Sequence, residues 1–126
     1  MLLIDTHVFI WMLYHPENLS ESARKAIMNN NLCLSIASLW EMSIKKTLGQ
    51  IEFDETIPEL ADICEHQGID ILPIKPEHLQ QIQALPLFHR DPFDRLIIAQ
   101  SLIEECPLIT HDWKIMKGYP EVSIIW

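Results

Sequence analysis

The sequence lacks the features that mark membrane-spanning and secreted proteins. It contains no run of about 18 apolar residues, the shortest stretch that crosses a bilayer as a helix. It has no Lys or Arg before Arg24, so the positively charged start of a secretory signal peptide is missing. These absences predict a cytoplasmic protein that does not associate with a membrane.

Cysteine and basic residues are also scarce. The three cysteines are widely spaced and form no Cys-x-x-Cys pair, which excludes a disulfide framework and a zinc site of that kind. The net charge is −9, because 18 acidic residues face 9 Lys and Arg, and such a chain is a poor general binder of polyanions. The 48% of hydrophobic residues excludes a disordered protein, and a length of 126 residues predicts one domain, 1–126.

Short apolar runs alternate with helical patterns along the whole chain. The expected strands are 2–4, 32–35, 69–74, 107–110 and 122–126, and the expected helices are 7–14, 20–29 or 22–29, 37–48, 58–66, 76–84 and 92–105. Gly49 is a suitable helix end, and Asp91 followed by Pro92 is a suitable helix start. The alternation predicts an α/β fold, a three-layer α/β/α sandwich with a mostly parallel central sheet of about five strands.

Four carboxylates stand at the ends of apolar runs that are far apart in the chain: Asp5, Glu41, Asp94 and Asp112. In an open α/β sheet the carboxyl ends of strands and the starts of helices share one edge, where ligands bind. Four carboxylates gathered there would repel one another, and a hard divalent cation such as Mg²⁺ or Mn²⁺ would relieve the repulsion. Such a site suits metal-assisted hydrolysis of a phosphodiester.

Each acid also has a purely structural alternative. Glu41 follows Ser38 at the spacing of a capping box, unless the helix begins near residue 35 and encloses Glu41. Asp91 is most simply a helix N-cap, and Asp94 favours the helix dipole three residues later. Asp5 ends a strand, and Asp112 opens a turn. The four acids together are more specific than any one of them.

Most of the basic residues lie within five positions of these acids: Lys45, Lys46, Arg90, Arg95, Lys114 and Lys117. The first five are interpreted as a basic rim that contacts RNA around the acidic centre, although plain surface charge near helix ends is an equal alternative. His7, His89 and His111 are interpreted as surface or helix-end residues and left outside the site. The four tryptophans are candidates for stacking on unpaired bases, but Trp40 and Trp126 suit core or dimer contacts better.

The acidic segments together resemble the PIN-domain nucleases, in particular the VapC-type toxins of bacterial toxin–antitoxin pairs. The matching segments are Leu3–Val8, Ser35–Glu41, His89–Gln100 and Leu108–Asp112, followed by a closing strand at Ile124–Trp126. The run Asp-Pro-Phe-Asp-Arg at 91–95 is the most particular of them. The resemblance covers the whole chain in order.

The resemblance implies an endoribonuclease that depends on Mg²⁺ or Mn²⁺, the toxin of a toxin–antitoxin pair. The metal-binding and catalytic acids would be Asp5, Glu41, Asp94 and Asp112, with Asp91, Thr6 and Thr110 as possible additions. A metal-activated water would cut RNA to leave a 5′-phosphate and a 3′-hydroxyl. A small antitoxin encoded alongside would restrain the enzyme, which is expected to be a homodimer. Part of the apolar run after Asp5 is expected to pack in the core and part to be left for these contacts: Phe9, Ile10, Trp11, Leu13 and Tyr14.

Three other functions fit parts of the pattern. A dehalogenase-type phosphatase needs a second Asp two residues after the first, where this chain has His7. A receiver-type signalling module needs acidic neighbours at Asp5 and a Lys after a late strand, whereas Lys75 comes too early. A catalytically silent PIN-like domain that only binds a partner remains an alternative, but the four intact acids argue against it.

Overall fold

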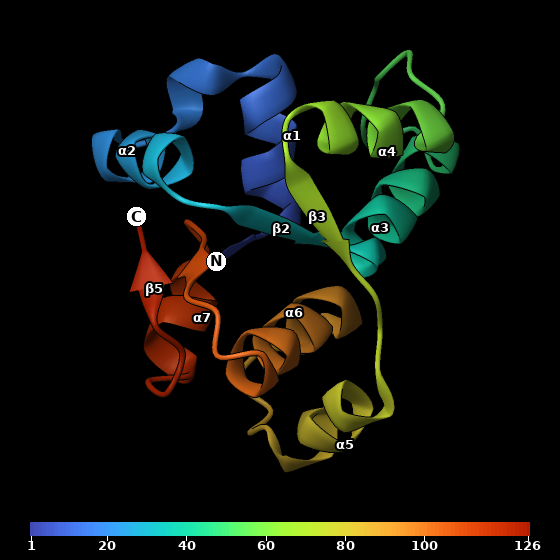
Figure 1. Cartoon of the computed structure of the whole chain (residues 1–126). Coiled ribbons are helices and arrows are strands. Elements are labelled where there is room, and N and C mark those ends of the chain that lie inside the picture. Colours follow the sequence, from blue (N-terminus) through green and yellow to red (C-terminus); the bar gives the residue numbers. More distant parts are fainter.

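A sheet of five parallel strands forms the centre of the protein, in the order β3-β2-β1-β4-β5 (Figure 1). The computed structural model describes all 126 residues. The strands are β1 (Leu2–Ile4), β2 (Leu32–Ser35), β3 (Ile69–Leu72), β4 (Leu108–Ile109) and β5 (Ile124–Ile125). The helices are α1 (Thr6–Tyr14), α2 (Glu21–Asn29), α3 (Ile36–Thr47), α4 (Ile57–His66), α5 (Pro76–Ala84), α6 (Pro92–Ile103) and α7 (Trp113–Gly118), and a 3₁₀ turn covers Pro16–Asn18.

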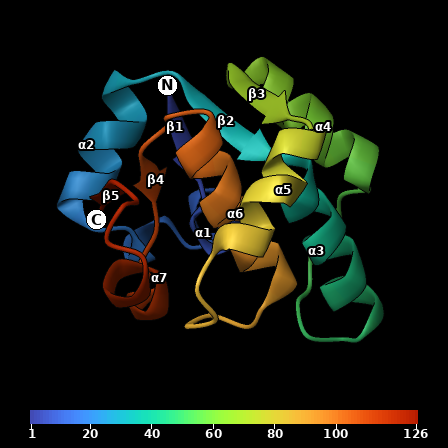
Figure 2. The same ribbon diagram turned by 90° about the horizontal axis from the view of Figure 1, so that it is seen from below.

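Two hydrophobic cores lie on the two faces of the sheet. Successive residues of a strand point to opposite faces, so Leu2 and Ile4 enter one core while Leu3 enters the other. The first core packs against α1 to α4, and the second packs against α6 and α7 (Figures 1 and 2). Helix α5 lies against α6, farther from the sheet. The predicted three-layer α/β/α sandwich with a parallel sheet is therefore confirmed.

None of the helices combines the length and the apolar character that a membrane-spanning helix needs.

The observed boundaries decide one question that the sequence left open. The side chain of Ser35 accepts the N–H of Ala37 and caps α3, so this helix begins at Ile36. Glu41 therefore lies inside the helix and does not complete a capping box with Ser38. The helix ends before Gly49, whose φ of +72° is a conformation that favours glycine. Helix α7 was not predicted, and β3 ends at Leu72, before Pro73.

The order of the strands fixes where a ligand can bind. The chain proceeds from β1 to β2 and β3 on one side, and then crosses to β4 and β5 on the other side. The order thus reverses between β1 and β4, and the carboxyl ends of two such strands form the usual ligand-binding crevice of an open α/β sheet. Asp5 directly follows β1, and Thr110 directly follows β4.

Candidate active site

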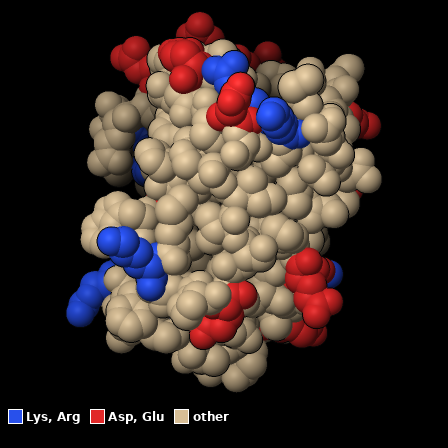
Figure 3. Space-filling view, turned by 90° about the vertical axis from the view of Figure 1, so that its left-hand side faces the viewer, with Lys and Arg blue, Asp and Glu red and all other residues tan.

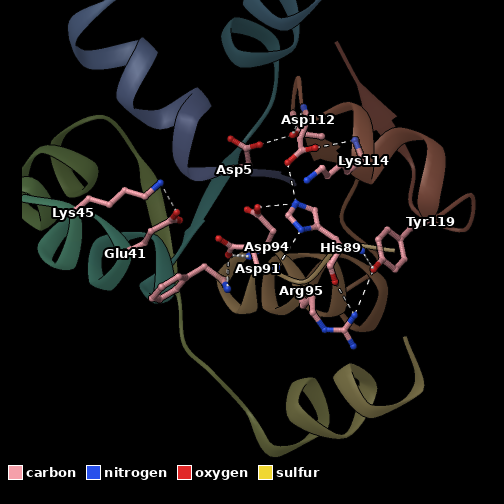
Figure 4. Close-up of polar contacts among 12 residues, drawn as sticks. Asp5, Glu41, Lys45, His89, Asp91, Asp94, Arg95, Asp112, Lys114 and Tyr119 are labelled. Carbon is pink, nitrogen blue, oxygen red and sulfur yellow. Dashed lines mark hydrogen bonds and ion pairs between the residues drawn. The ribbon is translucent and has the colours of Figure 1, made fainter. Parts of the chain in front are cut away.

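The four predicted acids converge at this carboxyl edge, each from a different element (Figure 4). Asp5 caps α1 and Asp112 caps α7, whereas Glu41 lies within α3 and Asp94 lies in the first turn of α6. The negative charges of the other three acids all raise the pKa of Asp94. The structure therefore places together residues that are as much as 107 positions apart in the sequence.

Thr110 joins two of the acids. Its hydroxyl donates to Asp5 Oδ2 and accepts the N–H of Asp112 at 3.0 Å. The other oxygen of Asp5, Oδ1, accepts the N–H of Val8 at 2.9 Å, and the side chain is only 4% exposed. Thr110 thus holds the carboxylate of Asp5 and the backbone of Asp112 in fixed positions. Thr6 does not have an equivalent contact, because its hydroxyl donates to Ser38 Oγ at 2.9 Å and connects α1 to α3.

Glu41 is buried with one carboxylate oxygen satisfied and the other not. Its Oε2 accepts from Lys45 Nζ at 2.9 Å, one helical turn away. Its Oε1 is buried and has no hydrogen-bond partner. A buried acceptor without a partner is costly, and a cation in the cluster would supply the missing interaction.

Asp91 and Asp94 have different environments although only three residues separate them. Asp91 Oδ1 accepts the N–H of Phe93 at 2.9 Å and that of Asp94 at 3.1 Å, so Asp91 is the N-cap of α6. Pro92 takes the first helical position, where its missing N–H does no harm. The Asp94 carboxylate points instead into the acid cluster (Figure 4).

His89 contacts two acids of the cluster, which the sequence interpretation did not anticipate. Its Nε2 is 2.9 Å from Asp94 Oδ2 and 3.0 Å from Asp112 Oδ2. A backbone N–H can only donate, and that of Asp91 points at His89 Nδ1 at 3.3 Å. Nδ1 is therefore the acceptor, and Nε2 carries the proton that the two carboxylates share. The sequence feature that could have predicted this role is the position of His89 two residues before a helix N-cap, where a side chain can fold back over the helix start.

The other histidines and tryptophans surround the acids or lie apart from them. His7 and His111 line the same hollow as Asp5 and Asp112, which has a volume of about 350 Å³. His111 stacks on Trp126 with ring centroids 4.8 Å apart, and Trp126 packs against the first core. Trp40 is 58% exposed and meets Phe93 edge-on, so it is not a core residue.

The predicted basic rim is only partly correct. Lys114 lies beside Asp112 (Figure 4), Lys45 pairs with Glu41, and Arg90 is exposed. The ammonium of Lys46 lies 4.4 Å from the centre of the Phe53 ring and is engaged outside the cluster. Arg95 was wrongly assigned to the rim, because it is only 9% exposed and points away from the acids.

Arg95 instead fixes the segment that precedes α6. Its guanidinium donates to four backbone carbonyls and contacts one hydroxyl: those of Ile82, Leu85, Pro86 and His89, and that of Tyr119. Arginine suits this task because its planar group presents several donors in fixed directions. Arg95 therefore positions His89 through the backbone, without touching the acids.

Replacing Arg95 with Lys should destabilise the protein by about 2–4 kcal/mol, because one ammonium cannot satisfy the same buried carbonyls. Urea unfolding followed by circular dichroism measures the change. The exposed Arg90→Gln is the matched control and should change stability by no more than about 0.5 kcal/mol. An Arg95→Lys protein as stable as the wild type would show that the carbonyls find other partners.

Burial and mutual repulsion raise the pKa of two acids of the cluster, Asp94 and Asp5. The pKa of Asp94 is raised to about 8, first by burial and then by the charges of Asp91, Glu41, Asp5 and Asp112. Burial also raises the pKa of Asp5, and the hydrogen bond from Thr110 opposes this effect. The site thus has an excess of negative charge that a cation would neutralise.

The donor set fits a divalent cation. It consists of carboxylate oxygens, among them the orphaned Oε1 of Glu41, and oxygen is the donor that Mg²⁺ and Mn²⁺ prefer. Donor atoms of His89, Asp94 and Asp112 lie within 4.8 Å of one another. Because the proton on Nε2 of His89 faces the acids, the carboxylates are the better candidates for ligands.

The raised pKa of Asp94 makes the stability of the metal-free protein depend on pH. A carboxyl whose pKa is higher in the folded protein than in the unfolded chain binds its proton more tightly when folded. Stability should therefore fall as the pH rises from about 4 to the folded value of about 8.

In EDTA, we expect a lower Tm near pH 8 than near pH 5.5. Added Mn²⁺ should raise Tm more at the higher pH, where the carboxylates are ionised. Differential scanning fluorimetry of the wild type and of Asp94→Asn tests both points, since the variant should depend less on pH. Equal pH dependence in the two proteins would contradict the assignment to Asp94.

Comparison with known proteins agrees with this geometry. The PIN domain family matches the chain over residues 2–119. Ribonuclease VapC22 of Mycobacterium tuberculosis is 29% identical over 130 residues, which cover 98% of this chain and 97% of that protein.

Solved structures share the fold at low sequence identity. A toxin–antitoxin complex from Klebsiella pneumoniae has a TM-score of 0.65 at 19% identity, and VapBC2 from Rickettsia felis, bound to a promoter DNA fragment, has a TM-score of 0.67 at 16% identity. Both matches cover 97% of this chain and 95% of the other chain. With the family match spanning nearly the whole sequence and the acids assembled at the switch point of the sheet, this chain belongs to the PIN domain family.

Proposed function

We propose that this protein is a metal-dependent endoribonuclease, the toxin of a toxin–antitoxin pair, acting in the cytoplasm as a single nuclease domain. The observation that carries the proposal is the convergence of Asp5, Glu41, Asp94 and Asp112 with a buried Glu41 oxygen that lacks a partner. The similarity to a ribonuclease and to toxin–antitoxin structures supports the same activity.

The protein's own groups would prepare the site for its cation and substrate. The four carboxylates would hold Mg²⁺ or Mn²⁺, while Thr110 and the N–H of Val8 fix the direction of Asp5. A bound cation supplies charge stabilisation at the phosphate and lowers the pKa of a coordinated water. Lys114, beside Asp112, would attract the RNA backbone. Cleavage would leave a 5′-phosphate and a 3′-hydroxyl.

Purified protein and a structured RNA test the activity directly. Cleavage should require Mg²⁺ or Mn²⁺, stop in excess EDTA, and give fragments that a 5′-phosphate-dependent exonuclease degrades. Cleavage that continues in EDTA would refute the metal dependence. No cleavage with either ion, for a folded protein tested on several RNAs, would favour a silent PIN-like domain that only binds a partner.

His89 should act as a positioning residue for the metal site. Without its shared proton, Asp94 and Asp112 lose a common partner, so His89→Ala should weaken Mn²⁺ binding by about 10-fold or more. Gln offers both a donor and an acceptor, so His89→Gln should retain more of the affinity. Isothermal titration calorimetry measures the binding. Tighter Mn²⁺ binding by His89→Ala would show that the imidazole competes with the cation.

We also propose that the protein forms a homodimer and is inhibited by a small antitoxin encoded alongside. Of the apolar residues on α1, Phe9 is fully buried, whereas Ile10, Trp11, Leu13 and Tyr14 are only partly buried, so part of this run packs in the core and part stays open to a partner. Large exposed apolar side chains lie elsewhere, at Trp40, Leu79, Leu87, Phe88 and Trp113 among others. Light scattering tests the dimer, and cleavage assays of the complex with the neighbouring gene product test inhibition. A fully active complex would refute the inhibition.

A further inference from the structure

A second hollow opens next to the acid cluster. It has a volume of about 230 Å³ and is lined by Phe88, Trp113, Lys114, Lys117 and Gly118. Two of these residues, Trp113 and Lys114, also line the hollow that contains Asp5 and Asp112. The two hollows therefore adjoin at Trp113 and Lys114. We call the second hollow the aromatic pocket.

The two aromatic rings of this pocket face the solvent although they are large and apolar. Phe88 is 67% exposed and Trp113 is 64% exposed. Phe88 is nevertheless held in place. A Cβ at Gly118 would approach the Phe88 Cβ to 2.9 Å, so glycine permits the close contact, and Tyr119 meets the ring edge-on at 6.1 Å between centroids. The Phe88 ring is thus held in a fixed position while its face stays open to solvent.

The pocket also combines these rings with positive charge in an acidic protein. Lys114 and Lys117 are exposed, and neither takes part in an ion pair. On the face of the molecule formed by α2, β5 and α7, some basic side chains lie at the lower left, apart from the acidic ones, and others lie beside acidic side chains near the top (Figure 3). Aromatic faces beside lysines are the combination that binds unpaired nucleotides, since every base can stack and every phosphate is an anion.

We propose that the aromatic pocket binds an unpaired nucleobase of the RNA substrate, next to the nucleotide at the acid cluster. The base would stack on Trp113 or Phe88, and Lys117 would contact the neighbouring phosphate. This subsite rests on the proposed ribonuclease function. Paired RNA is a poor match, because its bases are already stacked.

Binding of RNA in EDTA tests the pocket without cleavage. The probe is a fluorescent single-stranded RNA of about 12 nucleotides with mixed sequence, followed by anisotropy and compared with the duplex of the same sequence. Phe88→Leu keeps an apolar contact with Gly118 and Tyr119 but removes the aromatic face. We expect Phe88→Leu and Trp113→Leu each to weaken single-strand binding about fivefold or more, and duplex binding much less.

Two control variants separate the pocket from general surface effects. Leu87 is 69% exposed beside Phe88, and Leu87→Ala should bind the single strand as the wild type does. Lys117→Gln should weaken binding and reduce the slope of log K against log salt by about 0.7, which is one phosphate contact on a single strand. Lys25→Gln, an exposed lysine on α2, should leave that slope unchanged.

The outcomes are distinguishable from those of the proposed function. If the wild type cuts RNA with Mg²⁺ but both aromatic variants bind and cut like the wild type, the subsite is wrong and the ribonuclease function stands. If the variants lose single-strand binding although the wild type never cuts RNA, the subsite stands and the catalytic function is wrong. Unchanged RNA binding together with loss of a dimer in Phe88→Leu, or loss of antitoxin binding, would assign the pocket to a protein partner and overturn the proposal.

Discussion

Asp5→Asn is expected to abolish RNA cleavage while the protein stays folded. The one oxygen of asparagine can still accept the N–H of Val8, and its amide N–H can donate to the hydroxyl of Thr110, so the start of α1 and its contact with Thr110 should survive. The negative charge, however, is lost from a site that depends on charge to hold its cation. We expect the cleavage rate to fall by more than about 100-fold, the loss that follows removal of one key electrostatic group in other enzymes.

The same substitution should not lower the stability of the metal-free protein. Burial and the charge of Asp112 raise the pKa of Asp5, so the ionised form is a burden without a cation. Tm in EDTA should therefore equal or exceed that of the wild type, and the gain in Tm from added Mn²⁺ should largely disappear. Asp62→Asn, an exposed acid on α4, is the matched control. Cleavage by Asp5→Asn at the wild-type rate would refute the assignment.

Asp94→Asn and Asp91→Asn should separate the two acids of the Asp-Pro-Phe-Asp run. Asp94→Asn should remove most of the activity and weaken Mn²⁺ binding, because this carboxylate faces Glu41, Asp5 and Asp112. Asp91→Asn keeps a good N-cap for the N–H groups of Phe93 and Asp94, so it should change stability by only a few tenths of a kcal/mol. Its activity should fall modestly. Cleavage rates and calorimetric Mn²⁺ binding measure both effects.

Two other results would change this division. Equal and severe losses of activity in both variants would mean that Asp91 also reaches the cation, directly or through a water. Severe loss in Asp91→Asn alone would exchange the roles of the two residues. The outer oxygen of Asp91 leaves room for the first result, since only Oδ1 is engaged by the helix start.

The sequence was sufficient to predict the architecture and the convergence of the four acids at one edge of the sheet. Strands such as 2–4 and 32–35 are short apolar runs between helical patterns, and their alternation with helices requires a parallel sheet. The carboxyl ends of parallel strands share one edge, so the position of Asp5 just after β1 was informative by itself. The same reasoning gave Asp112 after β4.

The roles of His89 and Arg95 were not accessible in the same way. Both depend on contacts that local rules do not describe. Arg95 follows an acid near a helix start and so resembles a surface residue, yet it turns toward carbonyls at the end of α5 and in the segment between α5 and α6. His89 is in an irregular segment whose path is set by those same bonds. Helix α7 was missed because six residues give too little periodicity to recognise.

The bonds of Arg95 have a consequence for how this protein can diversify. They fasten the backbone of residues 82–89 to α6, so a change in the path of that segment would displace His89 and damage the acid cluster. Leu87 and Phe88 lie within the fastened segment, but their side chains point outward and are 69% and 67% exposed. Both side chains can therefore be exchanged without a change in the path of this segment, whereas an inserted residue there would displace His89 from Asp94 and Asp112.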